Sequence, residues 1–240
     1  NEFCRGREIY MITILQNFIV GKQERLDVLR DDILPDISDF FSEYDFCINY
    51  NSTKNFDSIH SLYKNHVDKL TFYNDLTMDW GKTVQSMLSE IKTDYVFIFP
   101  EDFKLCNFDK KYFNGLMSEI IEYDCKFVLM HRIEEVKYYG TNKKFFHLYD
   151  TKEYIHLTKG SECPASCLSS VAIYNKDFLI NYLSYYNTTE KSDRFPLATP
   201  NCYEWFSHDR LNTMFSDEQF GIPKRAVLQH YEPYDIKERV

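Results

Sequence analysis

The sequence lacks a block of basic residues. Its 37 aspartate and glutamate residues outnumber its 28 lysine and arginine residues, and the formal net charge is −9. A protein that binds nucleic acid needs a basic stripe to neutralise phosphates. We therefore expect no DNA or RNA partner.

Glycine and proline are scarce, with seven of each among 240 residues, whereas 44% of the residues are hydrophobic and 17% are aromatic. This composition excludes the disordered class. No linker-like change of composition, internal repeat or low-complexity tract divides the chain. The length suits one α/β domain with a substantial core, so we expect a single domain over residues 1–240.

Long apolar runs and regularly paired cysteines are missing as well. No run approaches the length of a membrane span, and no signal peptide opens the sequence. The seven cysteines are an odd number without the spacing of a disulfide scaffold. Cys163 and Cys167 are separated by three residues, and no second pair follows, which argues against zinc. We expect free thiols and a cytoplasmic location.

Strands and helices alternate through the first half of the chain. Apolar runs predict strands, and apolar residues at three- and four-residue spacing predict helices. Pro35 should end or kink the first helix. The predicted strands are 9–15, 45–50, 70–73, 95–99 and 126–130, and the predicted helices are 24–41, 56–63, a segment after Asp79 and 109–123. Such alternation is typical of a parallel sheet covered by helices.

The second half is less regular. Aromatic residues around Gly140 predict a hairpin or projecting loops within 136–155. A strand at 169–174, a helix at 176–186, a polar loop at 187–201, a helix at 203–215 and a strand at 225–230 follow.

Two adjacent acids, Glu101 and Asp102, follow the apolar run Tyr95–Phe99. Ligands of open α/β sheets bind outside the carboxyl ends of the strands, so these acids are candidates for a site. A solvated turn that begins at Pro100 explains the same residues, and both interpretations remain open at this point.

The segment from Asp79-Trp-Gly81 through a short helix and an apolar strand to Asp102 resembles the nucleotide-sugar glycosyltransferases of the GT-A fold, most closely the family-2-like group. The resemblance spans about Ile9 to His230. It implies a Rossmann-like three-layer α/β sandwich with a mostly parallel central sheet. It also implies a nucleotide-binding half at about 9–130 and an acceptor half at about 131–240.

By the same resemblance, the activity would be transfer of a sugar from a nucleotide-diphosphate donor to a hydroxyl acceptor, with inversion. The acceptor would be a glycan or lipid-linked molecule in polysaccharide biosynthesis, with peripheral membrane association allowed. A divalent Mn²⁺ or Mg²⁺ would stabilise the leaving diphosphate. The family has Asp-x-Asp where this chain has Pro100-Glu101-Asp102, so the implied metal ligands are Asp102, Glu101 and His230.

The resemblance also assigns the remaining site residues. Glu204, or Asp209 one turn further, would take the proton from the acceptor hydroxyl, although an acid in the first turn of a helix is also favoured by the helix dipole. The implied nucleotide contacts are Gln16, Asn17, Asn49, Asn51, Asp75 and Lys82, with Glu101 and Asp102. Polar residues at strand ends are also common turn formers.

Two other functions remain open. A nucleotidyltransferase shares this architecture, but it usually carries a glycine-rich basic loop after the first strand, and Gln16–Lys22 is a poor match. A non-catalytic domain that binds a glycan or nucleotide is compatible with the altered Asp-x-Asp, because fold does not determine function.

Overall fold

The computed structural model describes residues 12–77, 79–106, 109–130, 146–150, 152–158, 171–189, 220–225 and 228–230. The first half contains β1 (Ile12–Phe18), α1 (Gln23–Val28), η2 (Leu29–Ile33), α2 (Leu34–Phe41), β2 (Asp45–Tyr50), α3 (Phe56–Lys64), β3 (Lys69–Tyr73), α4 (Trp80–Glu90), β4 (Tyr95–Ile98), β5 (Phe103–Leu105), α5 (Lys110–Glu122) and β6 (Phe127–Leu129). The second half contains β7 (Phe146–Asp150), β8 (Tyr154–Thr158), β9 (Ala172–Asn175), α7 (Lys176–Thr189), β10 (Phe220–Pro223) and β11 (Leu228–His230).

Within the described residues, nine strands form one sheet in the order β3-β2-β1-β4-β9-β6-β10-β8-β7. The pairs β1–β2, β2–β3, β1–β4 and β6–β10 are parallel, and the remaining neighbours are antiparallel. It follows that β8 and β9 oppose the direction shared by the other seven strands. The sheet is therefore mostly parallel, as predicted.

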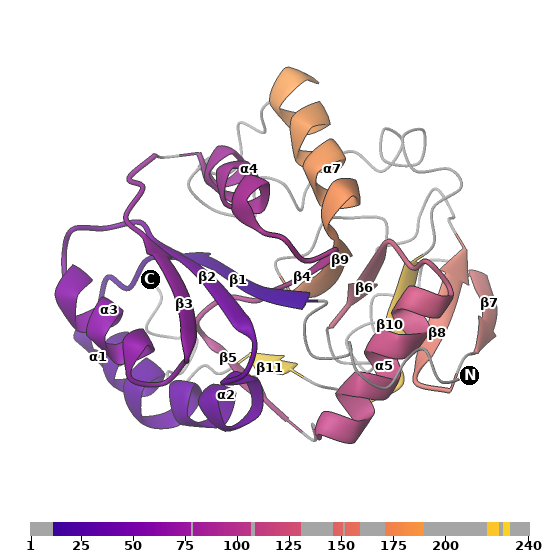
Figure 1. Ribbon diagram of the computed structural model, residues 1–240, viewed down its shortest axis with the longest axis horizontal. Helices are drawn as coiled ribbons and strands as arrows, with labels where there is room; N and C mark the ends of the chain where they lie inside the picture. The colour runs from indigo at the N-terminus through magenta and orange to yellow at the C-terminus, as the bar shows by residue number, and fades with distance from the viewer. Residues whose placement is uncertain are drawn as a thin grey trace, which may run out of the picture.

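Helices cover both faces of the sheet (Figure 1). On one face lie α4 and α7, whose side chains form a core with Leu15, Val96 and Ile98. On the other face lie the α1–α2 segment, α3 and α5, which pack around Ile14 and Phe97. The alternation of side chains along a strand sends neighbouring residues to opposite faces, so continuous apolar strands such as β4 bury residues in both cores.

The first predicted helix changes type along its length. The chain is α-helical over α1, π-helical over η2 and α-helical again over α2, with Pro35 in the first turn of α2. Proline provides no N–H for a helical hydrogen bond, and its ring is tolerated in a first turn. The helix does not end at Pro35: the chain stays helical from Gln23 to Phe41, and its hydrogen bonding changes over η2, directly before the turn that contains Pro35.

The order of strands in space differs from their order in the sequence. β9 lies antiparallel between β4 and β6, although the alternation up to Met130 suggested successive parallel strands. The late strand that contains His230 is β11, which pairs with β5 in a separate two-stranded sheet. β7 and β8 pair as antiparallel neighbours, while the segment around Gly140, where a hairpin or loops were expected, lies outside the described residues. Among the described helices, none has both the length and the apolar character needed to cross a membrane.

Candidate functional site

The parallel strands β1, β2, β3 and β4 end along one edge of the sheet, where three of the predicted site residues are joined. Asn49, fully buried at the end of β2, donates from Nδ2 to Asn17 Oδ1 at 3.0 Å and to the carbonyl oxygen of Asp75 at 3.1 Å. Its Oδ1 accepts from the N–H of Asp75 at 2.8 Å. We call Asn17, Asn49 and Asp75 the amide cluster.

The outer members of the amide cluster keep polar atoms that have no partner within the described residues. Asn17 and Asp75 are half-buried. Asn17 uses Oδ1 for Asn49, and Asp75 uses Oδ1 to accept from the N–H of Thr77 at 2.8 Å. The amide nitrogen of Asn17 and the Oδ2 atom of Asp75 remain, so this edge offers a donor and an acceptor from two residues that both hydrogen-bond to Asn49.

Two other predicted residues have local partners. Asn51 donates to the carbonyl oxygen of Thr77 at 3.1 Å, and its buried Oδ1 has no hydrogen-bond partner among the described residues. Lys82 is exposed on α4, and the described contact of its Nζ is with Asp79, 3.7 Å away. The structure therefore brings Asn51 to the segment after β3 but does not join Lys82 to the amide cluster.

Gln16 ties the end of β1 to its neighbours and is itself buried, with 1% of its surface exposed. Its Nε2 donates to the carbonyl oxygen of Phe99 at 3.2 Å, and its Oε1 accepts from the hydroxyl of Tyr63 at 2.6 Å. Burial raises the pKa of Tyr63, and the charge of Glu101 raises it further. Gln16 thus ties the end of β1 to Phe99 after β4 and to Tyr63 of α3.

Those acids are held by an arginine that the sequence did not single out. Arg25 of α1 places Nη2 at 2.5 Å from Glu101 Oε1 and at 3.1 Å from Asp102 Oδ2. The side chain of Glu101 is 7% exposed and that of Asp102 is 27% exposed. A buried carboxylate needs a partner for its charge, and Arg25 supplies it. We call these three residues the arginine–acid cluster.

The arginine–acid cluster fits a divalent cation poorly. Pro100 stands where the resemblance places a first aspartate, and the two remaining carboxylates share one guanidinium nitrogen. A metal ion bridging those oxygens would have to displace Arg25. Among the described residues, no group of three or more histidine, cysteine, aspartate or glutamate side chains could hold a metal.

The other predicted catalytic and metal residues are only partly described. The backbone of His230 in β11 pairs with Phe103, the residue after Asp102, so this part of the chain does lie beside the acids. Its side chain lies outside the description. Glu204 and Asp209 lie outside the described residues, and their assignment stays a prediction.

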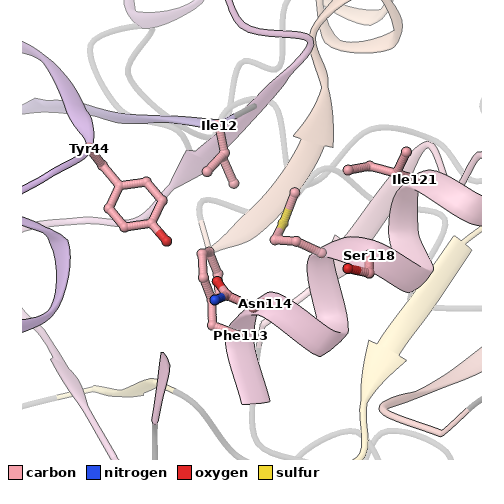
Figure 2. Close-up of a pocket in the computed structure, with 7 residues that line it drawn as sticks. Ile12, Tyr44, Phe113, Asn114, Ser118 and Ile121 are labelled. Carbon is pink, nitrogen blue, oxygen red and sulfur yellow. The ribbon is translucent and has the colours of Figure 1, made fainter. Parts of the chain in front are cut away.

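A small pocket lies at the start of β1, away from the strand ends just described (Figure 2). Figure 2 shows side chains of α5, including Phe113 and Asn114, beside Ile12 and Tyr44. The lining residues are Ile12, Tyr44, Phe113, Asn114, Met117, Ser118 and Ile121, none of which is charged. Such a pocket offers nothing to balance the charge of a phosphate, so the strand ends remain the candidate site.

The arrangement of strands and helices matches known structures. S. aureus TarS 1–349 in complex with UDP-GlcNAc superimposes with a TM-score of 0.59 at 12% identity, covering 93% of this chain and 59% of that one. The mannosyltransferase PcManGT from Pyrobaculum calidifontis, in complex with GDP-Man and Mn²⁺, gives 0.59 at 10% identity, with 95% and 58% covered. The chain has the GT-A fold.

At such low identities the GT-A likeness is one of architecture. This chain spans less than two thirds of the length of either structure. No protein-family model and no curated protein sequence matches it. The predicted Rossmann-like GT-A sandwich is confirmed, and the activity has to be argued from the site.

Proposed function

We propose that this protein is a nucleotide-sugar glycosyltransferase, which moves a sugar from a nucleotide-diphosphate donor to a hydroxyl group of a glycan or lipid-linked acceptor. The observation that carries the proposal is the position of the amide cluster and the arginine–acid cluster on neighbouring strand ends of a GT-A fold. This is the edge at which open α/β sheets bind ligands. The likeness to a UDP-GlcNAc complex and a GDP-Man complex supports the class of donor.

The amide cluster would bind the nucleoside. Asn49 is buried and holds its two neighbours in place, so it supports the site, while Asn17 and Asp75 provide the donor and the acceptor that touch the ligand. Asp75 Oδ2 suits an N–H group of a base or a ribose hydroxyl. Gln16 is a supporting residue in this proposal, because both ends of its amide already have partners.

For the chemical step, we propose the inverting mechanism. A carboxylate takes the proton from the acceptor hydroxyl, the acceptor oxygen attacks the anomeric carbon, and the bond from that carbon to the diphosphate oxygen breaks. Glu204 is our choice for this base, with Asp209 as the alternative. The described residues give a divalent ion no suitable set of ligands, so no step in this proposal depends on one.

Calorimetric titration of the purified protein with UDP, GDP and CDP tests the proposal. One diphosphate should bind with micromolar affinity, a range typical for substrates. Hydrolysis or transfer from the corresponding nucleotide sugar should then release that diphosphate. If no diphosphate binds, the proposal is wrong. If one binds but its nucleotide sugar is never turned over with any glycan or lipid-linked acceptor offered, a non-catalytic binding domain is the better account.

A further inference from the structure

Arg25 is anchored through only one of its nitrogen atoms. Nη2 accounts for both contacts in the arginine–acid cluster, at 2.5 Å to Glu101 and 3.1 Å to Asp102. A guanidinium has five N–H donors in a fixed planar fork. Nε and Nη1 have no partner within the described residues, and the side chain is 40% exposed. The acids therefore fix the position of a cation that still has donors to offer.

A second cation contacts the segment directly before α1. Lys54, in the turn between β2 and α3, donates from Nζ to the carbonyl oxygen of Gly21 at 3.4 Å. Gly21 and the exposed Lys22 belong to the segment between β1 and α1, four and three residues before Arg25. A Cβ atom added to Gly21 would meet no atom within 4 Å, so open space borders this backbone. Two cations from different elements thus flank one open loop.

We propose that the segment from Gly21 to Arg25, together with Lys54, binds the diphosphate of the donor without a divalent ion. Arg25 supplies the positive charge in place of a divalent ion. Glu101 and Asp102 position its side chain, and its remaining N–H groups bind phosphate oxygens. Charge-assisted bonds from arginine to phosphate are among the stronger hydrogen bonds in proteins. This inference rests on the proposed function, because it names the residues that hold the diphosphate of that donor.

Glu101 and Asp102 would act differently in this arrangement than in a metal site. As metal ligands, they must bind the ion directly, so removing a charge would weaken binding. As anchors of Arg25, they only accept its hydrogen bonds, and each of their negative charges opposes an anion bound nearby. Asp102→Asn keeps an oxygen for Arg25 while it removes one of those charges. It should therefore strengthen diphosphate binding by about two- to fivefold.

The experiment is calorimetric titration with UDP and GDP in EDTA and, separately, in excess Mn²⁺. The wild-type affinity should agree within about threefold between the two conditions. Arg25→Gln leaves the buried Glu101 without its cation and endangers folding. The double variant Arg25→Gln/Glu101→Gln removes both charges together, and its affinity should fall at least about tenfold. Arg30→Gln, an exposed arginine of η2 paired with Asp27 and Asp31, is the matched control and should bind as wild type.

The outcomes separate this inference from the proposed function. Binding that occurs with Mn²⁺ and vanishes in EDTA overturns the inference and leaves the transferase proposal standing. Wild-type affinity in the folded double variant, or weaker binding by Asp102→Asn, also overturns it. Absence of binding in both conditions refutes the inference and the proposed function together. Equal binding in both conditions with loss in the double variant supports the assignment of Arg25.

Discussion

At the scale of single residues, the most specific prediction concerns Asp75. One of its carboxylate oxygens is used by the N–H of Thr77, and its backbone is held by Asn49. Asp75→Asn preserves an oxygen for Thr77 and replaces the other acceptor with a donor. The affinity for the nucleoside diphosphate should fall about tenfold, since a ligand donor then faces an amide N–H.

The measurement for Asp75→Asn is the same titration, accompanied by thermal unfolding. Asp68→Asn is the matched control, because Asp68 is exposed and lies just before β3, at the opposite end of the strand. The control should keep wild-type affinity. Unchanged affinity in Asp75→Asn with an unchanged melting temperature would contradict the position that we assign to the nucleoside.

The prediction for the chemical step concerns Glu204. Glu204→Gln keeps the shape of the side chain and removes its basicity, so turnover should fall about 100-fold or more while the affinity for the donor stays nearly constant. Steady-state kinetics and donor titration measure the two quantities separately. If Asp209→Asn abolishes turnover and Glu204→Gln does not, the base lies one turn further along. If neither variant changes turnover and the product retains the anomeric configuration of the donor, the inverting mechanism is wrong.

At the scale of elements, the N-terminus of α4 shows how one side chain fixes the residue at which a helix begins. Asp79, 6% exposed, is the N-cap of α4, and its Oδ1 accepts a hydrogen bond from the N–H of Lys82 at 3.2 Å. Asp79→Ala should lower the free energy of unfolding by about 1 kcal/mol, whereas Asp79→Asn should retain most of it. Denaturant unfolding measures both.

Asp109→Ala is the companion variant, because Asp109 caps α5 in the same way, with Tyr112 N–H at 2.6 Å. It should cost a similar amount. Equal stability of Asp79→Ala and wild type would show that α4 begins without help from this side chain.

Elements with a strong local pattern were predictable. β2 spans the predicted residues, α3 extends one residue beyond its prediction, and β4 and α4 also lie where they were expected. The short β5 and β10 were missed, because a lysine in Phe-Lys-Leu and a glycine and proline in Phe-Gly-Ile-Pro interrupt the apolar run that marks a strand. The insertion of β9 between β4 and β6 was also hidden, since pairing between distant strands leaves no local mark in a sequence.

The candidate site was also predictable only in part. The resemblance implied Asn17, Asn49 and Asp75 from their positions at strand ends, and the structure joins the three by hydrogen bonds at one edge of the sheet. Their contact with a nucleotide stays a prediction. Arg25 was not identified: an arginine near the start of a helix is usually solvated, and its partners lie 76 and 77 positions away. Its role became visible only when the fold placed α1 against the end of β4.

At the scale of the whole molecule, one sheet edge carries both clusters, while the uncharged pocket lies at the start of β1. The net charge is −9, and the three cations at this edge, Lys22, Arg25 and Lys54, are accompanied by the three acids Glu24, Glu101 and Asp102. A diphosphate approaching an acidic protein is repelled over most of the surface. The N–H donors of Arg25 and Lys54 are therefore the groups at this edge that can offset the repulsion.

The central claim is that a nucleotide-sugar donor binds at this edge, and hydrogen exchange followed by mass spectrometry tests it most directly. Exchange would be compared with and without the nucleotide sugar whose diphosphate binds in titration. Binding protects backbone N–H groups that become ordered or covered. The account predicts protection within residues 17–25, 49–54 and 74–77. Protection confined to α5 and the uncharged pocket, with none at these strand ends, would contradict it.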